Sequence, residues 1–577
     1  MKKLAGSIRE YKKASILTPV FVSCEVVLEC FIPLLMARMI DRMTGESLNP
    51  ILGSGIILVL MAMLSLFCGT MSGRFAATAG CGFAKNLRKD LFYRIQEFSF
   101  ADIDKFSTSS LVTRLTTDVS NVQNAYQMLI RIAIRTPLML IFSMIMSFSI
   151  SVKMSLIFLA IIPVLGIALF SIIRTVFPIF KRIFKRYDAL NNSVQENVAG
   201  IRVVKSFVRE EFEQKKFEKA SGEVCQDFTH VERILALNSP IMMACIYTAM
   251  LLVSFFGARI IVTSGATELT TGQLSSLINY GVQILSSMMM LSMVFVMMTL
   301  ASESAVRICE VLDHRTSLTS PENPVMTVSD GSVDFDNVSF RYRAGSGNDA
   351  LSEIDLHIPS GTTVGIIGGT GSSKTTLIQL ISRLYDATSG TVRVGGVDVR
   401  KYDLEALRNE VAVVLQKNVL FSGTIKENLR WGKADATDEE IQHVCKLAQA
   451  DEFIKTFPQG YDTYIEQGGT NVSGGQKQRL CIARALLKHP KVLILDDSTS
   501  AVDTRTDALI RRAFAEEIPD TTKIIIAQRV ASVESADMIL VMEGGRIVER
   551  GTHDELMALK GIYQEIYVLQ THGKEVA

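Results

Sequence analysis

The sequence predicts two domains of different fold class: an α-helical domain of six membrane spans at residues 1–315 and an α/β domain at residues 331–577, joined by a linker at residues 316–330. Two observations lead to this prediction. Of the 577 residues, 48% are hydrophobic, and they crowd into the first half of the chain. From about Gly331 the pattern changes to short β-branched strands, glycine-rich turns and amphipathic helices, which is typical of α/β domains.

Six apolar stretches in the first half are long enough to cross a membrane, since a helix needs about 20 apolar residues to span the hydrocarbon core. They are Ile16–Met39, Ile51–Met71, Met128–Ser149, Met154–Ile173, Ile234–Val262 and Leu274–Leu300. A basic N-terminus precedes the first stretch, but no small-residue cleavage site follows it, and the stretch is too long for a signal peptide. We therefore expect it to remain in the mature chain.

Two long polar stretches, Gly73–Gln127 and Arg174–Arg233, carry much of the Lys and Arg of the first half, whereas the alternate loops are short and poor in positive charge. The positive-inside rule therefore places both termini and both long stretches in the cytoplasm. Helices that continue through Lys85–Phe98 and Phe184–Val204 would project into the cytosol. The cap-forming run Phe106–Ser110 suits a tip where the chain reverses direction. An ordinary solvated helical loop is the alternative.

Two features inside the spans are candidates for contacts with something other than lipid. Glu25 and Glu29 are four residues apart and share one face of the first helix, and carboxylates within a membrane usually face a cavity or a partner. The alternative is a pair that is simply hydrated at a wet interface. The sixth span is rich in methionine, which suits varied apolar ligands, although plain packing is the alternative. These residues are Met288, Met289, Met290, Met293, Met297 and Met298.

Net charge and cysteine spacing argue against two other classes of protein. A net charge of +1 excludes a dominant polyelectrolyte mode of nucleic-acid binding, so no nucleic-acid partner is expected. The nine cysteines are scattered without C-x-x-C pairs, which gives no support for a zinc site or a disulfide framework. We expect free thiols, most of them buried.

A glycine-rich loop follows a short apolar strand, Val364–Ile367, and leads into a helix, which is the context that a phosphate-binding loop requires. Its residues are Gly368, Gly369, Thr370, Gly371, Ser372, Ser373, Lys374, Thr375 and Thr376. Backbone N–H groups would cradle phosphates, Lys374 would reach the β- and γ-phosphates, and Thr375 would hold Mg²⁺. Ser373 stands where the motif G-x-x-x-x-G-K-[ST] has glycine, so it must accept the backbone geometry of glycine or shift it slightly.

A second hydrophobic strand, Val492–Asp496, ends in a carboxylate, the expected ligand of a Mg²⁺-bound water. Before it, a helix opens with Ser473, Gly474, Gly475 and Gln476. With these motifs in this order, the sequence closely resembles the ATP-binding cassette family, whose signature is the S-G-G-Q tetrad between the phosphate loop and the acidic strand. The resemblance covers nearly the whole chain. It implies ATP and Mg²⁺ as ligands, and a RecA-like domain with antiparallel β and helical subdomains.

Other members of the family's motif set occur in order. Tyr342 resembles the aromatic residue that stacks on adenine, and Gln416 resembles the glutamine that senses the γ-phosphate, belongs to the metal site and contacts the membrane domain. The run Ser500–Asp503 resembles the loop that links two ATP sites, and Asp503 is a candidate nucleotide-binding residue. With Phe421–Ile425 and Gln195–Lys205, the chain is similar to bacterial and eukaryotic multidrug-type exporters. We expect a multi-pass protein of a bacterial cell membrane.

The resemblance implies a dimer in which two cassettes meet head to tail, so that each ATP lies between one chain's phosphate loop and the other chain's S-G-G-Q. Two positions depart from the family. Asp497 stands where the family has a glutamate as general base, and its shorter side chain retracts the carboxylate by roughly 1.5 Å, one C–C bond. Gln528 stands where the family has its switch histidine, and glutamine cannot exchange a proton near neutral pH.

A base misplaced by about 1 Å can cost on the order of 10²-fold in rate, so we expect this chain's own site to bind ATP and hydrolyse it poorly. The intact Ser473–Gln476 would serve the active site of a different half-transporter that carries Glu and His, in a heterodimer. Drift in a slow homodimer is the alternative. The expected cargo is amphipathic or hydrophobic and drug-like. A peptide or lipid exporter, and a nucleotide-gated channel or regulatory subunit, are the other hypotheses.

Overall fold

The computed structural model describes residues 3–43, 49–342, 349–497 and 502–572. The chain divides into two compact units. The first comprises Met1–Gln96 and Thr108–His314, and the second comprises Glu97–Ser107 and Arg315–Ala577. A short segment from the helical half of the sequence therefore belongs with the C-terminal unit.

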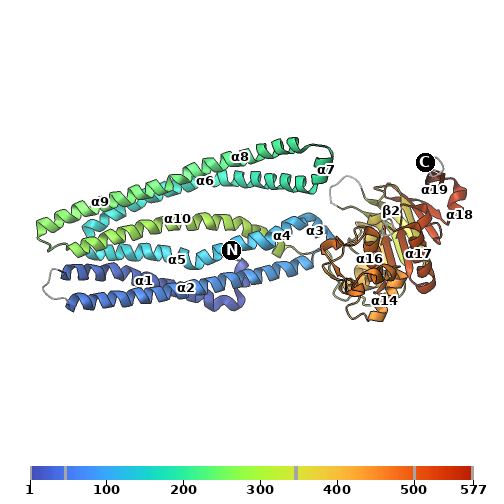
Figure 1. Ribbon diagram of the computed structural model, residues 1–577, viewed down its shortest axis with the longest axis horizontal. Coiled ribbons are helices and arrows are strands. Elements are labelled where there is room, and N and C mark those ends of the chain that lie inside the picture. The colour runs from blue at the N-terminus through green and yellow to red at the C-terminus, as the bar shows by residue number, and fades with distance from the viewer. Residues whose placement is uncertain (1–2, 44–48, 343–348, 498–501, 573–577) are drawn as a thin grey trace. The chain divides into compact units, whose positions relative to one another are not determined.

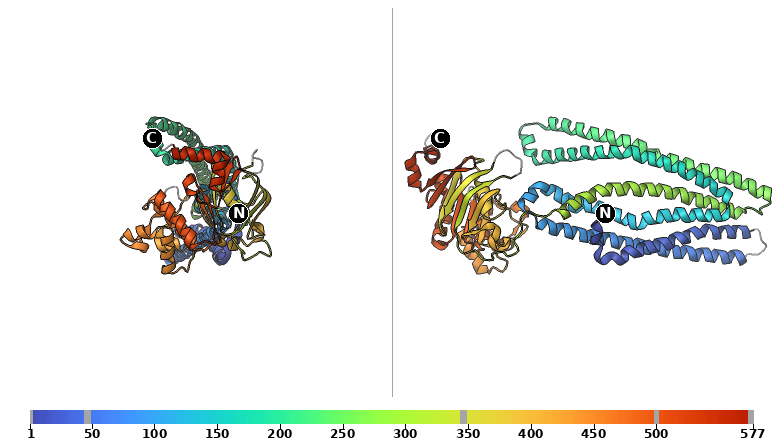
Figure 2. Two further views of the ribbon diagram at one scale, coloured as in Figure 1. Left: turned by 90° about the vertical axis from the view of Figure 1, so that its right-hand side faces the viewer. Right: turned by 180° about the vertical axis from the view of Figure 1, so that it is seen from behind.

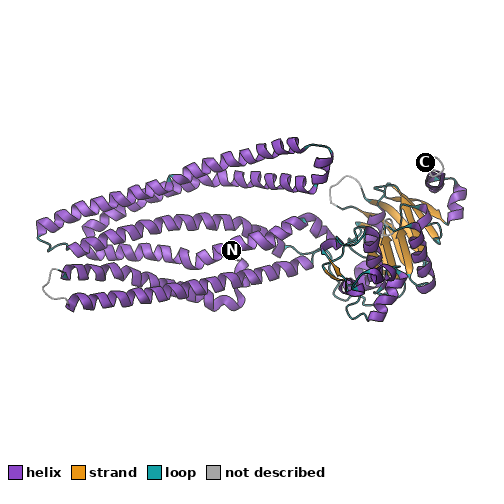
Figure 3. Ribbon diagram, viewed as in Figure 1, coloured by secondary structure: helices purple, strands orange, loops and turns teal. Residues whose placement is uncertain are grey.

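The first unit is a bundle of long helices (Figures 1 and 3), and every strand among the described residues lies in the second. Six helical stretches are long and apolar enough to cross a membrane, which confirms the predicted six spans. They are Lys3–Arg42, Ile51–Gln96, Thr108–Ile150, Val152–Ile179, Glu210–Ser264 and Thr271–Asp313. The main helices are α1 (Lys12–Arg42), α2 (Asn49–Gln96), α5 (Val119–Ile150), α6 (Val152–Ala199), α8 (Glu210–Ala236), α9 (Asn238–Ser264) and α10 (Thr271–Asp313). Shorter segments are η1 (Lys3–Tyr11), α4 (Thr108–Thr113), the π-helix η2 (Arg114–Asp118) and α7 (Ile201–Ser206).

Two helices of the first unit run far beyond their apolar stretches. α2 and α6 each have 48 residues, which at 1.5 Å per residue is about 72 Å, against roughly 30 Å of hydrocarbon core. α6 and α8 lie side by side over much of their length (Figures 1 and 2). Both helices therefore continue well beyond their apolar stretches, α2 as far as Gln96 and α6 as far as Ala199.

The tip between α2 and α5 differs from the prediction. The chain leaves α2 at Gln96, and Ser99 caps a short helix, α3 (Phe100–Phe106), in a reciprocal capping box with Asp102. The chain turns again at Ser107, whose φ is 56°, and helix resumes with α4. The predicted single break at Phe106–Ser110 is therefore wrong in extent, because the reversal is spread over two turns that flank α3. The Ser-x-x-Asp spacing of the capping box was the sequence signal for this helix.

Helix α1 buries one stripe of its surface inside the bundle. Val22, Val26 and Cys30 are almost fully buried and pack against Met139 of α5. The spacing of three and four residues is that of one helical face. This stripe fixes which side chains of α1 point away from lipid.

The cysteines and methionines depart in part from expectation. All nine cysteines are free, as predicted, but only four are buried, namely Cys30, Cys68, Cys445 and Cys481. In α10, Met288 and Met289 pack against the core of the bundle. Met290, Met293 and Met297 are instead exposed, by 43%, 51% and 40%. The methionine cluster therefore divides between packing and an exposed face.

The second unit contains three sheets. An antiparallel sheet has the order β2-β1-β4-β5, a six-stranded sheet has the order β12-β11-β3-β10-β9-β6, and β7 pairs with β8. The strands are β1 (Val333–Phe340), β2 (Leu351–Ile358), β3 (Thr363–Gly368), β4 (Ser389–Val394), β5 (Val397–Asp398), β6 (Val411–Val414), β7 (Gly423–Thr424), β8 (Tyr464–Ile465), β9 (Val492–Asp496), β10 (Thr522–Ile526), β11 (Met538–Glu543) and β12 (Arg546–Gly551). The helices are α11 (Lys374–Ile381), α12 (Leu404–Glu410), α13 (Ile425–Leu429), α14 (Asp438–Leu447), α15 (Asp451–Thr456), α16 (Gly474–Leu486), α17 (Thr504–Glu517), α18 (His553–Leu559) and α19 (Ile562–His572). These elements match the predicted α/β domain with antiparallel β and helical subdomains.

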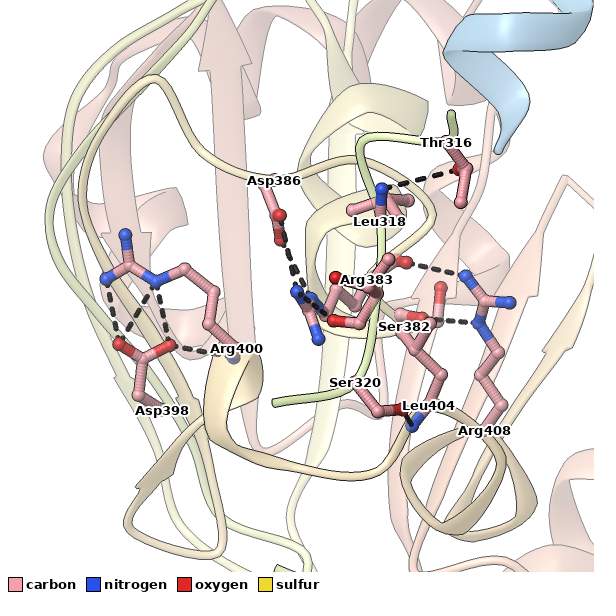
Figure 4. A network of polar contacts seen from close by, with 11 residues as sticks. Thr316, Leu318, Ser320, Ser382, Arg383, Asp386, Asp398, Arg400, Leu404 and Arg408 are labelled. Carbon is pink, nitrogen blue, oxygen red and sulfur yellow. Dashed lines mark hydrogen bonds and ion pairs between the residues drawn. The ribbon is translucent and has the colours of Figure 1, made fainter. Parts of the chain in front are cut away.

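Residues 316–330, expected to be a linker, pack on the second unit (Figure 4). The side chain of Leu318 is buried. The hydroxyl of Ser320 accepts a 3.1 Å hydrogen bond from the backbone amide of Leu404, and the guanidinium of Arg383 donates to a carbonyl of the segment at 3.3 Å. The segment therefore belongs to the folded unit.

Candidate nucleotide-binding site

The candidate site lies along one edge of the six-stranded sheet. Strands β3, β10, β9 and β6 are neighbours and run parallel. Parallel strands end at the same edge, and ligands of open α/β sheets bind there. β3 ends in the phosphate loop and β9 ends at Asp496, while Gln528 and Gln416 each follow two residues after β10 and β6. The topology thus gathers four motifs that are far apart in the sequence.

The phosphate loop is closed around its own lysine. Lys374 Nζ donates to the carbonyls of Gly368 and Gly369 at 2.9 and 2.8 Å, and to Ser372 Oγ at 3.2 Å. Burial lowers the pKa of Lys374, while the nearby carboxylates Asp496 and Asp497 oppose that shift. The ammonium group of Lys374 therefore lies beside the loop, and the nearby carboxylates balance only part of its positive charge. A phosphate group could balance the rest.

Ser373 takes the backbone conformation of the glycine that it replaces. Its φ and ψ are 69° and 26°, in the left-handed region, where a non-glycine residue costs on the order of 1–3 kcal/mol. Gly371 also has positive φ, and a Cβ there or at Gly369 would meet nothing within 4 Å. The loop keeps the expected geometry and leaves open space above its backbone, as a phosphate cradle requires.

Thr375 and Asp496 form the candidate metal site. Thr375 Oγ1 donates to the two carboxylate oxygens of Asp496 at 3.1 and 3.0 Å. Asp496 is 2% exposed, and burial raises its pKa. A hydroxyl and a carboxylate are the hard oxygen ligands that Mg²⁺ prefers. The residues present therefore fit the ion.

The two positions that depart from the family lie in contact. Gln528 Nε2 donates a 2.7 Å hydrogen bond to Asp497 Oδ2. Burial raises the pKa of Asp497, whereas hydrogen bonds from the side chains of Gln416 and Gln528 oppose the rise. The φ of Asp497 is 49°, so this residue too holds a left-handed conformation. One carboxylate and two amides thus meet at the end of β9.

Gln570, on α19, holds the segment that carries Gln528. Its Nε2 donates to the carbonyl of Gln528 at 2.8 Å, and its Oε1 accepts from the amide of Val530 at 2.9 Å. The same amide side chain therefore fixes backbone groups on either side of one turn. Sequence reasoning missed Gln570, because no motif marks a single glutamine near the end of a chain.

Tyr342 lies half-exposed at the other end of the loop. Its hydroxyl is 2.9 Å from Thr376 Oγ1 and donates to Gln379 Oε1 at 3.1 Å. The ring of Tyr385 stands edge-on to it, with centroids 5.3 Å apart, and the hydroxyl of Tyr385 donates to Asp104 of α3 at 2.9 Å. Tyr342 is 46% exposed, which leaves ring surface for a base. Tyr385 was not identified from the sequence.

The signature tetrad lies in a separate place. Ser473 caps α16, accepting from the amide of Gln476 and donating its own amide to that side chain. A cavity of about 420 Å³ opens beside this helix start. It is lined by Ser473, Gly474, Gly475, Arg479, Val502 and Asp503, with no residue of the phosphate loop. The structure therefore groups Asp503 with the signature, while Ser500 and Ala501 lie outside the described residues.

Arg479 supplies positive charge to the signature cavity. Its guanidinium donates to the carbonyl of Gln449 at 2.6 Å and lies 4.6 Å from the ring centre of Phe453. Burial lowers the pKa of Arg479. A fixed cation beside a helix N-terminus favours an anionic ligand in this cavity.

Two family models match the chain. The model described as the ABC transporter transmembrane region matches residues 16–301, and the one described as ABC transporter matches residues 351–500. One match lies mainly in the first unit and the other lies within the second.

Two curated proteins and one solved structure are similar to the chain over nearly their full length. The uncharacterized ABC transporter ATP-binding protein YfiB of Bacillus subtilis is 36% identical, covering 100% of this chain and 99% of that protein. The probable multidrug resistance ABC transporter ATP-binding/permease protein YheI of Bacillus subtilis is 33% identical, covering 99% and 97%. The structure of a bacterial Atm1-family ABC exporter with ATP bound has a TM-score of 0.82 at 25% identity, covering 98% of both chains.

Proposed function

Because this chain belongs to the ABC transporter family and has the two domains of an exporter half-transporter, we propose that it is one subunit of a heterodimeric pump for amphipathic or hydrophobic, drug-like compounds. Its own ATP site would hydrolyse weakly, and its signature would complete the active site of a different half-transporter. Both termini would lie in the cytoplasm of a bacterial cell, with the spans in the cell membrane.

The observation that carries the asymmetric part of this proposal is the contact between Asp497 and Gln528. A general base must come within about 2.6–3.2 Å of the proton that it takes. Asp497 is one methylene shorter than the family's glutamate, and its Oδ2 already accepts a 2.7 Å bond from Gln528. The side-chain N–H of Gln528 can only donate a hydrogen bond. Asp497 Oδ2 is therefore bonded to a group that cannot accept the proton which a general base would remove from water.

The remaining residues of the site would bind nucleotide. Tyr342 would stack on adenine, the loop from Gly368 to Thr376 would cradle the phosphates, and Lys374 would reach the β- and γ-phosphates. Thr375, Asp496 and Gln416 would hold Mg²⁺, which when bound neutralises charge on the phosphate oxygens. Strong binding with slow hydrolysis is the expected result.

Two surfaces support the requirement for a second chain. The signature cavity has no phosphate-loop residue in its lining, so the phosphates of an ATP held by another chain's phosphate loop would fill it. In α7 and directly after it, Val203, Phe207 and Val208 are 59%, 73% and 81% exposed. Exposed apolar side chains at such a tip favour a protein partner. We propose that this tip docks on the partner's cassette, while α3 serves this chain's own cassette.

Two observations support the proposed cargo class. The relative YheI is named a probable multidrug resistance transporter. On α10, Met290, Met293 and Met297 form an exposed face of adaptable side chains, which suits apolar ligands of varied shape. A hydrophobic drug-like cargo fits both observations.

The test is transport by the tagged full-length chain, isolated from its own host with whatever chain co-purifies and placed in proteoliposomes. We expect ATP-dependent accumulation of a fluorescent amphipathic dye such as Hoechst 33342, and no accumulation with a non-hydrolysable ATP analogue. A second half-transporter should co-purify in equal amount. Dye movement that ATP analogues sustain equally well would indicate a channel and overturn the pump.

A further inference from the structure

An ion cluster lies inside the membrane bundle, where the ATP chemistry does not use it. Arg135 of α5 donates to Glu25 Oε1 at 2.6 Å and to both carboxylate oxygens of Glu29 at 2.9 and 2.7 Å. The side chain of Glu25 is only 8% exposed. Glu29 is 27% exposed. The burial of Glu25 favours the hypothesis that its carboxylate faces a cavity or a partner.

The position of Glu25 within α1 places it deep in the bundle. It follows Ile16, the start of the apolar stretch, by nine residues, or about 14 Å of helix against a core of roughly 30 Å. It also belongs to the buried stripe of α1 between Val22 and Val26. Ionisable residues at such depth are costly and usually mark a substrate or ion pathway.

The cluster carries more negative than positive charge. Two carboxylates, Glu25 and Glu29, share one guanidinium. Arg131 lies one turn before Arg135 on α5, and a Cβ at Gly73 would be 3.5 Å from its Nη1. Within the described part of the chain, Arg131 makes no ion pair. An uncompensated charge this deep costs several kcal/mol, so a counter-charge would be strongly favoured.

Two buried polar atoms near the cluster have no hydrogen-bond partner within the described residues. One is Glu25 Oε2, and the other is the hydroxyl of Ser72 on α2, whose residue is 0% exposed. Gly69 lies three residues before Ser72, on the same helical face. A Cβ at Gly69 would lie 2.9 Å from Glu25 Oε1. The absence of a side chain at Gly69 therefore makes space for the Glu25 carboxylate. The Ser72 hydroxyl, on the same face of α2, is a second buried polar group without a hydrogen-bond partner among the described residues.

We propose that Glu25, with Glu29, Arg135 and Ser72 around it, binds the ammonium group of a cationic amphipathic cargo. An ammonium group supplies the missing positive charge and donates N–H bonds to Glu25 Oε2 and to the Ser72 hydroxyl oxygen. A neutral cargo supplies neither the charge nor a charge-assisted bond. The inference rests on the proposed export function and narrows its cargo to amphiphiles with a charged amine.

The test compares a matched pair of fluorescent probes, daunorubicin, which carries an ammonium group, and N-acetyldaunorubicin, which does not. Equilibrium binding is measured by fluorescence on the tagged full-length chain with its co-purifying partner in nanodiscs, against empty nanodiscs. We expect the wild type to prefer the amine by about tenfold or more, the range of one hydrogen bond to a charged group. Glu25→Gln should abolish that preference and leave binding of the acetylated probe unchanged within about twofold.

Two further variants make the result specific. Gly69→Ala keeps every charge but should push the Glu25 carboxylate aside and reduce the same preference. Glu268→Gln is the matched control, because Glu268 forms an exposed ion pair with Lys153 at 3.4 Å far from the cluster, and it should retain the preference. The ratio of the two affinities is independent of how much protein folds, so poor expression of a variant does not blur the outcome.

The outcomes separate the two proposals. Equal binding of both probes by the wild type, or an unchanged ratio in Glu25→Gln, would overturn the ammonium site while leaving drug export intact. Binding of neither probe by the wild type would overturn the proposed cargo class and this inference together. Loss of both probes to the same extent in Glu25→Gln would identify the cluster as a structural clamp and also overturn the inference.

Discussion

Gln528 and Asp497 are bonded to each other, with 2.7 Å between Nε2 and Oδ2. These are the two positions at which the chain departs from the catalytic pattern of its family, so the departures form one local arrangement rather than two separate losses. β10 and β9 are adjacent parallel strands. Asp497 is the first residue after β9, and Gln528 is the second after β10. A change at one position therefore alters the surroundings of the other.

The first prediction is that both residues must be restored together. In the chain purified alone, Asp497→Glu with Gln528→His should raise steady-state ATPase activity by about 10²-fold, the scale on which a misplacement near 1 Å acts. Each single substitution should raise the ATPase rate by less than half of the combined effect on a logarithmic scale, because the effects of substitutions at contacting residues are not additive. A gain from Asp497→Glu alone that equals the double variant would show that Gln528 has no part in the weak hydrolysis.

A second prediction concerns pH and stability without nucleotide or Mg²⁺. Burial raises the pKa of Asp497 in the folded state. Its contribution to stability is therefore fully present below the unfolded pKa and is lost as pH rises through the folded pKa. Asp497→Asn should raise the melting temperature relative to wild type more at pH 7 than at pH 4.

The control for this pH dependence has the opposite sign. Asp503 caps α17, and hydrogen bonding from the backbone of Thr506 lowers the pKa of Asp503. Asp503→Asn should therefore cost stability near pH 7 and progressively less as pH falls through its folded pKa. Parallel pH trends for the two variants would contradict the assignment of the Asp497 shift to burial.

The sequence predicted what depends on local pattern. Six apolar stretches gave six spans, and the order of the phosphate loop, signature and acidic strand predicted the cassette. Contacts between distant segments could not be predicted, because nothing local marks them: Gln570 holds the backbone of Gln528 from 42 residues away. The turn at Ser99 was missed for another reason, since its capping box was present but the serine-rich run after Phe106 was the stronger cap pattern.

A third prediction tests the strain at Ser373. Its φ of 69° favours glycine, so Ser373→Gly should stabilise the cassette by about 1 kcal/mol, net of the added freedom of the unfolded chain. For a domain of this size that is about 2–4 °C in melting temperature. Ser372→Gly is the control: its Oγ bonds Lys374 at 3.2 Å, and we expect no gain there. Equal effects at both positions would contradict the strain.

A fourth prediction concerns Tyr385, which contacts both α3 and the adenine-stacking candidate Tyr342. Tyr385→Phe keeps the ring packing but removes the 2.9 Å bond to Asp104. In the two-chain complex we expect basal ATPase to change by less than about twofold, and stimulation by transported dye to fall about tenfold, the scale of one bond to a charged group.

The matched control is Tyr402→Phe, which removes a buried hydrogen bond to the carbonyl of Val394 at 2.8 Å without touching α3. Tyr402→Phe should lower the free energy of unfolding by about as much as Tyr385→Phe does, and it should leave the stimulation of ATPase activity by dye unchanged. If both variants lose stimulation equally, the effect of Tyr385 is one of stability and not of coupling.

The last prediction tests the asymmetry of the complex. The active site would combine the partner's base with this chain's signature, so Ser473→Ala or Gly474→Asp should nearly abolish ATPase activity, because the signature supplies bonds to the γ-phosphate. Asp497→Asn should do much less, since that carboxylate stands where hydrolysis is already weak. The order of the effects matters more than the absolute rates, because residues of one site act non-additively.

Ser473 also caps α16, and losing a cap costs about 0.5–2 kcal/mol. Thr437→Ala separates this loss from catalysis, since Thr437 caps α14 in the same kind of capping box outside the site. It should match Ser473→Ala in lost stability and retain ATPase activity. Nucleotide binding is measured in the same preparations. If Asp497→Asn proved as damaging as Ser473→Ala with binding intact, Asp497 would be a working base, and the weak site would have to lie in the partner.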